Sequence, residues 1–295
     1  MVREPADPKA YNSPRMRQIA IIGAGELGGA TAHALARCDI VPTIRLIDER
    51  GRVAEGKALD MMQAAPIEGF AAEVIGSTSL ADAGGAAVVV IADRTAGEEW
   101  QGEDAVQLLR RLAELTSGTV FLCAGSSQRE LVDRGVHELH IDRLRLFGSA
   151  PEGLASAARA LVALALDGSP RDVALSVLGV PPSRIVVPWE DVAVGGFAVT
   201  RLLDEPTRRR VGRQVAAVWP PGPHALAAAV TKAVDAMCGR TRSVVSCFVA
   251  PDTSLGRRTR TAALPVRLGA PGIVEVVLPS LSVVDRVALD NAMQR

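Results

Sequence analysis

A glycine-rich turn near the start of the chain constrains the possible folds most strongly. Residues 23–28 read Gly-Ala-Gly-Glu-Leu-Gly and lie between an apolar run at 18–22 and a helix-periodic segment that ends near Arg37. Strand, glycine turn and helix in this order are typical of a dinucleotide-binding βαβ unit. A second apolar run, at 43–47, ends at Asp48, 20 residues after Gly28. This context makes the motif a strong prediction of a Rossmann fold.

The predicted nucleotide site consists of the turn and the acid, with the residues Gly23, Gly25, Glu26, Leu27, Gly28 and Asp48. Glycines let the backbone approach a pyrophosphate closely, and the free N–H groups and dipole of the helix N-terminus attract its charge. Asp48 would accept hydrogen bonds from the adenosine ribose and repel a 2′-phosphate, so we expect NAD rather than NADP. The prediction requires a cleft free of the protein's own side chains, with Asp48 facing it. A structural glycine turn that binds nothing is the alternative.

Apolar runs and helical segments alternate up to residue 148, which predicts a doubly wound parallel sheet with helices on both faces. Beyond this point the pattern is that of an α+β domain. It starts with a long Ala/Leu-rich helix at 151–166, a strand at 173–178 and a hairpin through 187–199. Helices, three further strands and a closing helix from Ser282 follow. The chain is therefore predicted to have a flexible extension at 1–17, a Rossmann domain at 18–148 and an α+β substrate-type domain at 149–295.

Composition excludes several classes of partner. The chain has 33 Lys and Arg and 33 Asp and Glu, so no net positive charge attracts nucleic acid. No apolar run approaches the about 18 residues that a membrane span requires. The four cysteines lie in apolar stretches without a CxxC pair, which indicates reduced core thiols and no metal site. We expect a cytoplasmic protein without a nucleic-acid or membrane partner.

Three short stretches carry a resemblance to a known family. They are Ile21-Ile22-Gly23-Ala24-Gly25, Leu46-Ile47-Asp48 and a Gly-Lys-Ala-Leu-Asp-Met helix at 56–61, which continues into an Ala-Pro segment at 65–70. In these stretches the chain resembles the malate/lactate dehydrogenase family. The resemblance implies a Rossmann domain followed by an α+β substrate domain, and a homodimer or homotetramer. It also implies hydride transfer between NAD and a 2-hydroxy acid, with a His–Asp pair moving the proton and arginines holding carboxylates.

The residues of that chemistry do not occur where the resemblance places them. Pro181 stands at the position of the family histidine, Leu154 at that of the aspartate and Ala157 at that of the arginine. The loop at 93–104, which carries two arginines in the family, is acidic here, and the Thr-Asn-Pro string after the fifth strand reads Ala-Gly-Ser at 124–126. Acid–base catalysis by a positioned side chain contributes roughly 10²–10⁴-fold, so malate and oxaloacetate are poor candidate substrates.

Replacement groups are few. His224, in a Gly-Pro-His-Ala turn that borders the substrate pocket in the family, could act as a displaced base or form part of a pocket wall. His33, on the first Rossmann helix, is expected to pack or to face solvent, and His137 and His140 are expected on the surface. One of Arg94, Arg129 and Arg184 could anchor an anion or be solvated. Glu98, Glu99 and Trp100 could form a lid for a cationic or neutral ligand, since carboxylates and aromatic faces attract guanidinium and ammonium groups.

Two hypotheses for the function remain. The leading one is an NAD(H)-binding protein that lacks the family's standard dehydrogenase reaction and serves as a sensor or assembly partner. The alternative is an NAD-dependent oxidoreductase with a rebuilt pocket, acting on a CH–OH or carbonyl group of a non-dicarboxylate substrate. A purely structural protein is the third reading. The physiological ligand, if any, is not determined by the sequence.

Overall fold

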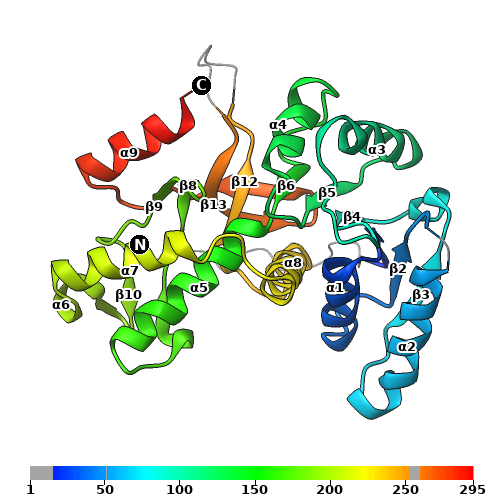
Figure 1. Ribbon diagram of the computed structural model, residues 1–295, viewed down its shortest axis with the longest axis horizontal. Coiled ribbons are helices and arrows are strands. Elements are labelled where there is room, and N and C mark those ends of the chain that lie inside the picture. The colour runs from blue at the N-terminus through cyan, green and yellow to red at the C-terminus, as the bar shows by residue number, and fades with distance from the viewer. Residues whose placement is uncertain (1–15, 51, 253–259, 295) are drawn as a thin grey trace, which may run out of the picture.

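The fold was analysed in a computed structural model, which describes residues 16–50, 52–252 and 260–294. The predicted N-terminal extension lies outside the described residues up to residue 15. Two halves are visible, with the N-terminal strands and helices α1 to α4 on one side and α5, α6, α7 and α9 on the other (Figure 1). Helix α8 (Pro223–Met237) lies between them and contacts both α1 and α5.

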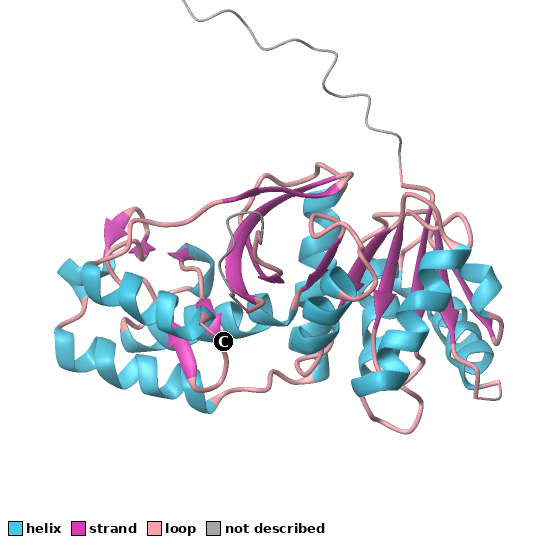
Figure 2. Cartoon of the chain, turned by 90° about the horizontal axis from the view of Figure 1, so that it is seen from above, coloured by secondary structure: helices cyan, strands magenta, loops and turns pink. Residues whose placement is uncertain are grey.

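The N-terminal half is built on a six-stranded parallel sheet. Its strands are arranged in the order β3-β2-β1-β4-β5-β6, which is the Rossmann order with the reversal between β1 and β4. Figure 2 shows these strands fanned side by side. Their bounds are β1 (Gln18–Ile22), β2 (Thr43–Ile47), β3 (Glu73–Ser77), β4 (Val88–Ile91), β5 (Val120–Cys123) and β6 (Leu146–Gly148). The predicted doubly wound parallel sheet is confirmed.

Both faces of this sheet are buried, which explains the unbroken apolar strands. Successive residues of a strand point to opposite faces, so Ile19 and Ile21 belong to one core and Ala20 and Ile22 to another. The first core is covered by α1 (Glu26–Arg37), α2 (Val53–Glu68) and α8, and the second by α3 (Gly102–Leu115) and α4 (Arg129–His137). The predicted helices agree with these bounds within a few residues, although α2 continues through Pro66 to a left-handed Gly69.

The C-terminal half extends the same sheet with antiparallel strands. Strand β12 (Val245–Val249) pairs with β6 and with β13 (Ala262–Gly269), which in turn pairs with β14 (Gly272–Val276) and β8 (Leu178–Val180). Strand β9 (Arg184–Val186) pairs with β8 at the edge. The helices of this half are α5 (Ala150–Ala165), α6 (Val199–Leu202), α7 (Glu205–Ala217) and α9 (Val283–Met293). The predicted α+β character is present, and the boundary at residue 149 stays a prediction.

Three local predictions are corrected. The strand predicted at 173–178 is two strands in different sheets, because β7 (Val173–Ala174) pairs with β10 (Ala193–Val194) whereas β8 pairs with β9 and β13. The predicted hairpin is reduced to β10 and β11 (Phe197–Ala198). Among the cysteines, Cys123 and Cys247 are buried, but Cys38 is exposed because it follows the last turn of α1. In the described part of the chain, no helix has the length and hydropathy to cross a membrane.

Candidate functional site

The glycine turn lies where the Rossmann fold places a pyrophosphate, between β1 and the N-terminus of α1. Gly23 has a positive φ of 105°, and its N–H donates to Ile47 O over 2.7 Å, which ties the turn to the end of β2. A side chain at Gly28 would lie 1.9 Å from Gly23 O, so this glycine allows the helix to pack against the strand. The turn therefore has the backbone of a dinucleotide site, and Glu26 is exposed on the first turn of α1.

The amides at the start of α1 already have an anionic partner within the chain. Leu27 N donates to Asp93 Oδ2 over 3.0 Å, and Gly28 N donates to Asp93 Oδ1 over 2.8 Å. Asp93 follows β4 and is only 5% exposed. Both oxygens of its carboxylate thus occupy the position in which a helix N-terminus binds a phosphate.

Gly25 shows how closely Asp93 approaches the turn. A side-chain carbon at Gly25 would lie 2.3 Å from the Asp93 carboxylate and 2.5 Å from Arg94 O. The Gly25 N–H also donates to Asp93 O, over 3.3 Å. The space that a glycine leaves open for a pyrophosphate is filled here by the segment after β4.

Asp48 faces the turn, as predicted, but its oxygens are already bonded. Its Oδ2 accepts hydrogen bonds from Ala24 N (2.8 Å), Thr95 N (3.2 Å) and the Thr95 hydroxyl (2.7 Å), and its Oδ1 accepts one from Arg50 N (2.9 Å). Burial raises the Asp48 pKa, but hydrogen bonds, those from Ala24 and Thr95 above all, bring it below its usual value. Three of these four donors share Oδ2 and one binds Oδ1, so Oδ2, which has about two lone-pair sites, is fully used.

Beside Asp48 a cavity of about 310 Å³ remains. Its lining includes Ile47, Leu80 and Leu108 as apolar walls and Arg94 and Trp100 from the segment after β4. Ile47 ends the strand that precedes Asp48, so the cavity lies where the fold places the adenosine half of a dinucleotide.

Arg94 and Trp100 contact each other at this cavity. The Arg94 guanidinium lies 4.0 Å from the centre of the Trp100 ring, and its Nη2 donates to Asp104 over 2.9 Å. The predicted attraction of the Trp100 face for a guanidinium is therefore satisfied by a residue of the same loop. Arg94 Nε and Trp100 Nε1 are buried and have no hydrogen-bond partner among the described residues.

Glu99 closes the far end of the cleft. It accepts hydrogen bonds from Ser126 N (2.9 Å), the Ser126 hydroxyl (3.0 Å) and Ser127 N (2.7 Å), in the turn after β5. A side chain at Gly125 would lie 2.4 Å from a Glu99 oxygen. Glu99, predicted as part of a lid, is thus bound to the turn that the resemblance assigns to nicotinamide and substrate. Glu98 is exposed.

The residues of the turn suit NAD, but the conformation does not. A pyrophosphate on the Leu27 and Gly28 amides would meet the Asp93 carboxylate, which has the same sign of charge. Ribose hydroxyls on Asp48 would compete with Thr95. In this conformation the cleft does not fit the dinucleotide, and the requirement for a cleft free of the chain's own side chains is not met.

The structure places apolar groups where the resemblance expects catalytic ones. Leu154 is completely buried in α5 and packs in an apolar cluster, and Ala157 is half-buried on the same helix. Pro181 is buried directly after β8. None of these side chains carries a proton that can be transferred or a charge that can hold a carboxylate.

The predicted replacement groups are dispersed. His224 is exposed on the first turn of α8, and no residue of α8 is among the described residues that line the 310 Å³ cavity. His33 is half-buried and bonds Glu68 over 2.7 Å, His140 is exposed, as expected, and His137 is half-buried at the end of α4. Two of the candidate arginines bond carbonyl oxygens of the C-terminal half, namely Arg129 to Thr261 O and Arg184 to Asn291 O. No cluster of three or more metal-ligating side chains occurs among the described residues.

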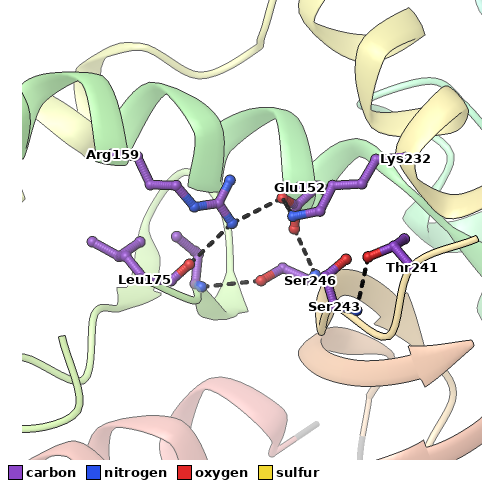
Figure 3. A network of polar contacts seen from close by, with 8 residues as sticks. Glu152, Arg159, Leu175, Lys232, Thr241, Ser243 and Ser246 are labelled. Atoms are coloured by element: carbon purple, nitrogen blue, oxygen red, sulfur yellow. Dashed lines mark hydrogen bonds and ion pairs between the residues drawn. The ribbon is translucent and has the colours of Figure 1, made fainter. Parts of the chain in front are cut away.

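A buried ionic network lies next to these apolar positions, and the sequence did not reveal it. Glu152, 2% exposed on α5, contacts Arg159 at 2.8 Å and Lys232 at 2.5 Å, and accepts from Ser246 N at 2.8 Å (Figure 3). Arg159 also donates to Leu175 O over 3.0 Å. The network joins α5, α8 and β12. Glu152 has all its partners within the protein, so it fulfils a structural role.

Sequence reasoning also missed Asp93 and Thr95 as cleft residues, although a signal was available. Strand β4 pairs with β1 in parallel, with Ile91 opposite Ile22. In a parallel sheet the carboxyl ends of neighbouring strands lie at one edge, so residues after β4 face the glycine turn after β1. An aspartate two residues beyond Ile91 should therefore have been weighed as a partner for the α1 amides.

Comparisons with known proteins agree with this fold. Residues 17–130 match the family model described as lactate/malate dehydrogenase, NAD binding domain. A malate dehydrogenase of Thermomicrobium roseum is 28% identical over 295 residues, covering 94% of each chain, and one of Desulforudis audaxviator is 26% identical over 299 residues, covering 95% of this chain and 96% of that protein. A solved structure of malate dehydrogenase from Salinibacter ruber has a TM-score of 0.83 at 22% identity and 93% coverage of both chains. Residues 17–130 therefore match the NAD-binding domain of the lactate/malate dehydrogenase family, and the chain is similar to malate dehydrogenases over nearly its whole length.

Proposed function

We propose that this chain binds NAD(H) but does not carry out the 2-hydroxy acid dehydrogenase reaction of its family, and that it serves as an NAD(H)-responsive sensor or assembly partner. One observation carries the proposal. Pro181, Leu154 and Ala157 stand where the resemblance places the groups for proton transfer and carboxylate binding, and Leu154 is fully buried among apolar side chains. None of these three side chains offers an acid–base group or a cation to a substrate.

The expected loss of reaction rate follows from the missing acid–base and charged groups. A positioned general acid or base contributes roughly 10²–10⁴-fold to a rate, and an electrostatic partner for a developing oxyanion contributes about 3 kcal/mol. These contributions are not additive, but without either group only the proximity of the reactants remains. The name of the relatives, malate dehydrogenase, is the main argument for an active enzyme.

Binding and turnover measurements test the proposal. Purified protein is titrated with NADH up to millimolar concentration by calorimetry, and 2-oxo acids and neutral carbonyl compounds are then screened for loss of NADH absorbance. We expect binding without turnover of any 2-oxo acid. Turnover of oxaloacetate or pyruvate by the wild type would contradict the catalytic part, and absence of NADH binding would contradict the rest.

The variant His224→Ala tests the alternative hypothesis, an active oxidoreductase with a rebuilt substrate pocket. His224 is an exposed histidine at the start of α8, so its replacement should leave the fold intact. Turnover of a neutral carbonyl that disappears in this variant, but persists in His137→Ala, would favour an oxidoreductase that uses His224 as its base. The number of subunits in the proposed homodimer or homotetramer can be measured on the same samples by light scattering.

A further inference from the structure

One segment of the chain contacts every part of the dinucleotide cleft. Asp93 binds the amides at the start of α1, Thr95 binds the Asp48 carboxylate, and Glu99 binds the amides after β5. The segment is held together by Arg94 N, which donates to Glu98 O over 2.8 Å, and by a bridge between Asp93 and Glu99. These contacts to the cleft are polar.

The chemistry of these contacts imitates a dinucleotide. A helix N-terminus that binds pyrophosphate offers backbone N–H groups to anionic oxygens, and here both oxygens of Asp93 accept from such groups. The acid after the second strand accepts a hydrogen bond from a ribose hydroxyl in a Rossmann site, and here Asp48 accepts one from the Thr95 hydroxyl at 2.7 Å. The Asp93 carboxylate thus takes the place of the pyrophosphate, and the Thr95 hydroxyl takes the place of a ribose hydroxyl.

We propose that Asp93 and Thr95 are an internal mimic of the dinucleotide, which competes with NAD(H) for the cleft. The inference rests on the proposed function, in that it assumes binding of NAD(H). The cofactor can reach the α1 amides and Asp48 only when the 93–95 segment leaves them. The apparent affinity then equals the affinity of the open cleft multiplied by the fraction of molecules that are open.

Several features make the mimic displaceable. Its anchors are hydrogen bonds that NAD(H) could replace with bonds of the same kind, so their loss is compensated on binding. The closed segment leaves Arg94 Nε and Trp100 Nε1 buried without a partner among the described residues, which is a cost of the closed state. The next residues, Ala96, Gly97 and Glu98, are exposed, and Gly97 has a positive φ of 85°. A loop of this kind can move without disturbing the sheet.

The variant Asp93→Asn tests the competition because it keeps the shape of the side chain and removes its charge. Dissociation constants for NADH are measured by calorimetry and by tryptophan fluorescence, since Trp100 lines the cavity. We expect binding at least about tenfold tighter than in the wild type, together with a lower thermal midpoint without ligand. A higher NADH affinity together with a lower thermal midpoint would identify Asp93 as a competitor of NADH. A merely structural residue would lower both affinity and stability, and that result would overturn the inference.

Glu98→Gln is the matched control. It removes one negative charge from the same loop. Glu98 is exposed, its backbone oxygen accepts a hydrogen bond from Arg94 N, and its side chain is not among the described partners of the α1 amides. We expect its NADH affinity to change less than about threefold at physiological ionic strength, because exposed charges are screened over about 8 Å. An equal gain in Glu98→Gln and Asp93→Asn would mean that general repulsion, and not occupancy of the amides, weakens binding.

Fragments of the dinucleotide test whether the segment opens as one unit. Adenosine has ribose hydroxyls but no phosphate, whereas ADP-ribose has both. Both ligands need Asp48, so Asp93→Asn should tighten both by raising the open fraction, and Thr95→Val should tighten both by roughly threefold. Should Asp93→Asn fail to fold, Thr95→Val decides, and unchanged binding of adenosine and NADH in that variant overturns the inference.

The outcomes separate this inference from the proposed function. Equal NADH binding by wild type and Asp93→Asn would retain an NAD(H)-binding protein and overturn the mimic. Binding by Asp93→Asn alone would support the mimic and contradict NAD(H) binding by the wild type at the concentrations tested. Absence of binding in every variant would overturn both.

Discussion

In the nucleotide cleft polar side chains stand in the places of a ligand, whereas on α5 and after β8 apolar side chains stand where the resemblance places catalytic groups. Asp93 and Thr95 offer the glycine turn and Asp48 the same types of hydrogen bond that a dinucleotide would offer. Leu154 and Pro181 offer nothing that a substrate could bind or exchange a proton with. A site closed by hydrogen bonds can reopen, because its partners are exchangeable, but apolar side chains cannot gain acid–base groups or charges by moving.

The ionic network beside α5 extends the comparison. Glu152, Arg159 and Lys232 are charged, but they are bonded to one another and to backbone groups rather than arranged around a cavity (Figure 3). Charge in the cleft faces a ligand site, and charge here joins α5 to α8 and β12. Charged residues therefore have different roles in the two regions. Variants in the cleft are expected to change NADH affinity, whereas variants in the network are expected to change the free energy of unfolding.

The largest effect is expected for Glu152→Gln. Removal of the shared carboxylate leaves Arg159 and Lys232 without their buried partner, so the free energy of unfolding should fall by about 3 kcal/mol. The dissociation constant for NADH should not change, because the network lies outside the cleft. Urea denaturation and calorimetry measure the two quantities. Glu205→Gln, which removes an exposed ion pair with Arg209, is the control and should cost less than about 1 kcal/mol. A shift in NADH affinity in Glu152→Gln would break the comparison.

A smaller effect, with a defined pH dependence, is expected for Asp48→Asn. The folded protein lowers the Asp48 pKa, so the carboxylate stabilises the fold above its unfolded pKa of about 3.9, and this contribution disappears as the pH falls through the lower folded value. We expect a loss of about 1–3 kcal/mol at pH 7 that shrinks in strong acid. Urea denaturation of both proteins at neutral and acidic pH measures it. The exposed acid Asp60 supplies the control Asp60→Asn, and a loss independent of pH would contradict the assignment.

The smallest effect is expected for Gly56→Ala. Gly56 is exposed within α2, and a side chain there would meet no atom within 4 Å. Alanine should therefore stabilise the helix by about 0.5–1 kcal/mol without changing NADH affinity, as thermal denaturation and calorimetry would show. Gly25→Ala is the contrasting variant, because its side chain would collide with the Asp93 carboxylate and lower the stability. An equal change in thermal stability in the two variants would mean that the Asp93 carboxylate does not lie against Gly25.

Patterns within short stretches of the chain predicted the Rossmann half well. The glycine turn, the apolar strands and the position of Asp48 depend on residues close in sequence, and the structure confirms the strand order that they imply. The strand predicted at 173–178 was wrong because its two ends pair with different partners, and pairing is not visible in a short segment. The loss of the family's catalytic residues stays a prediction, which depends on the residue types that the resemblance aligns with those positions.

Whether the cleft is open was a question of tertiary structure. Asp93 and Gly28 are 65 residues apart, Thr95 and Asp48 are 47 apart, and Glu152 and Lys232 are 80 apart. Local spacing specifies which backbone groups the turn presents, because those groups belong to one strand and one helix. Which acceptor reaches them depends on the order of the strands and on the path of the loop after β4, and these follow from the packing of the whole sheet.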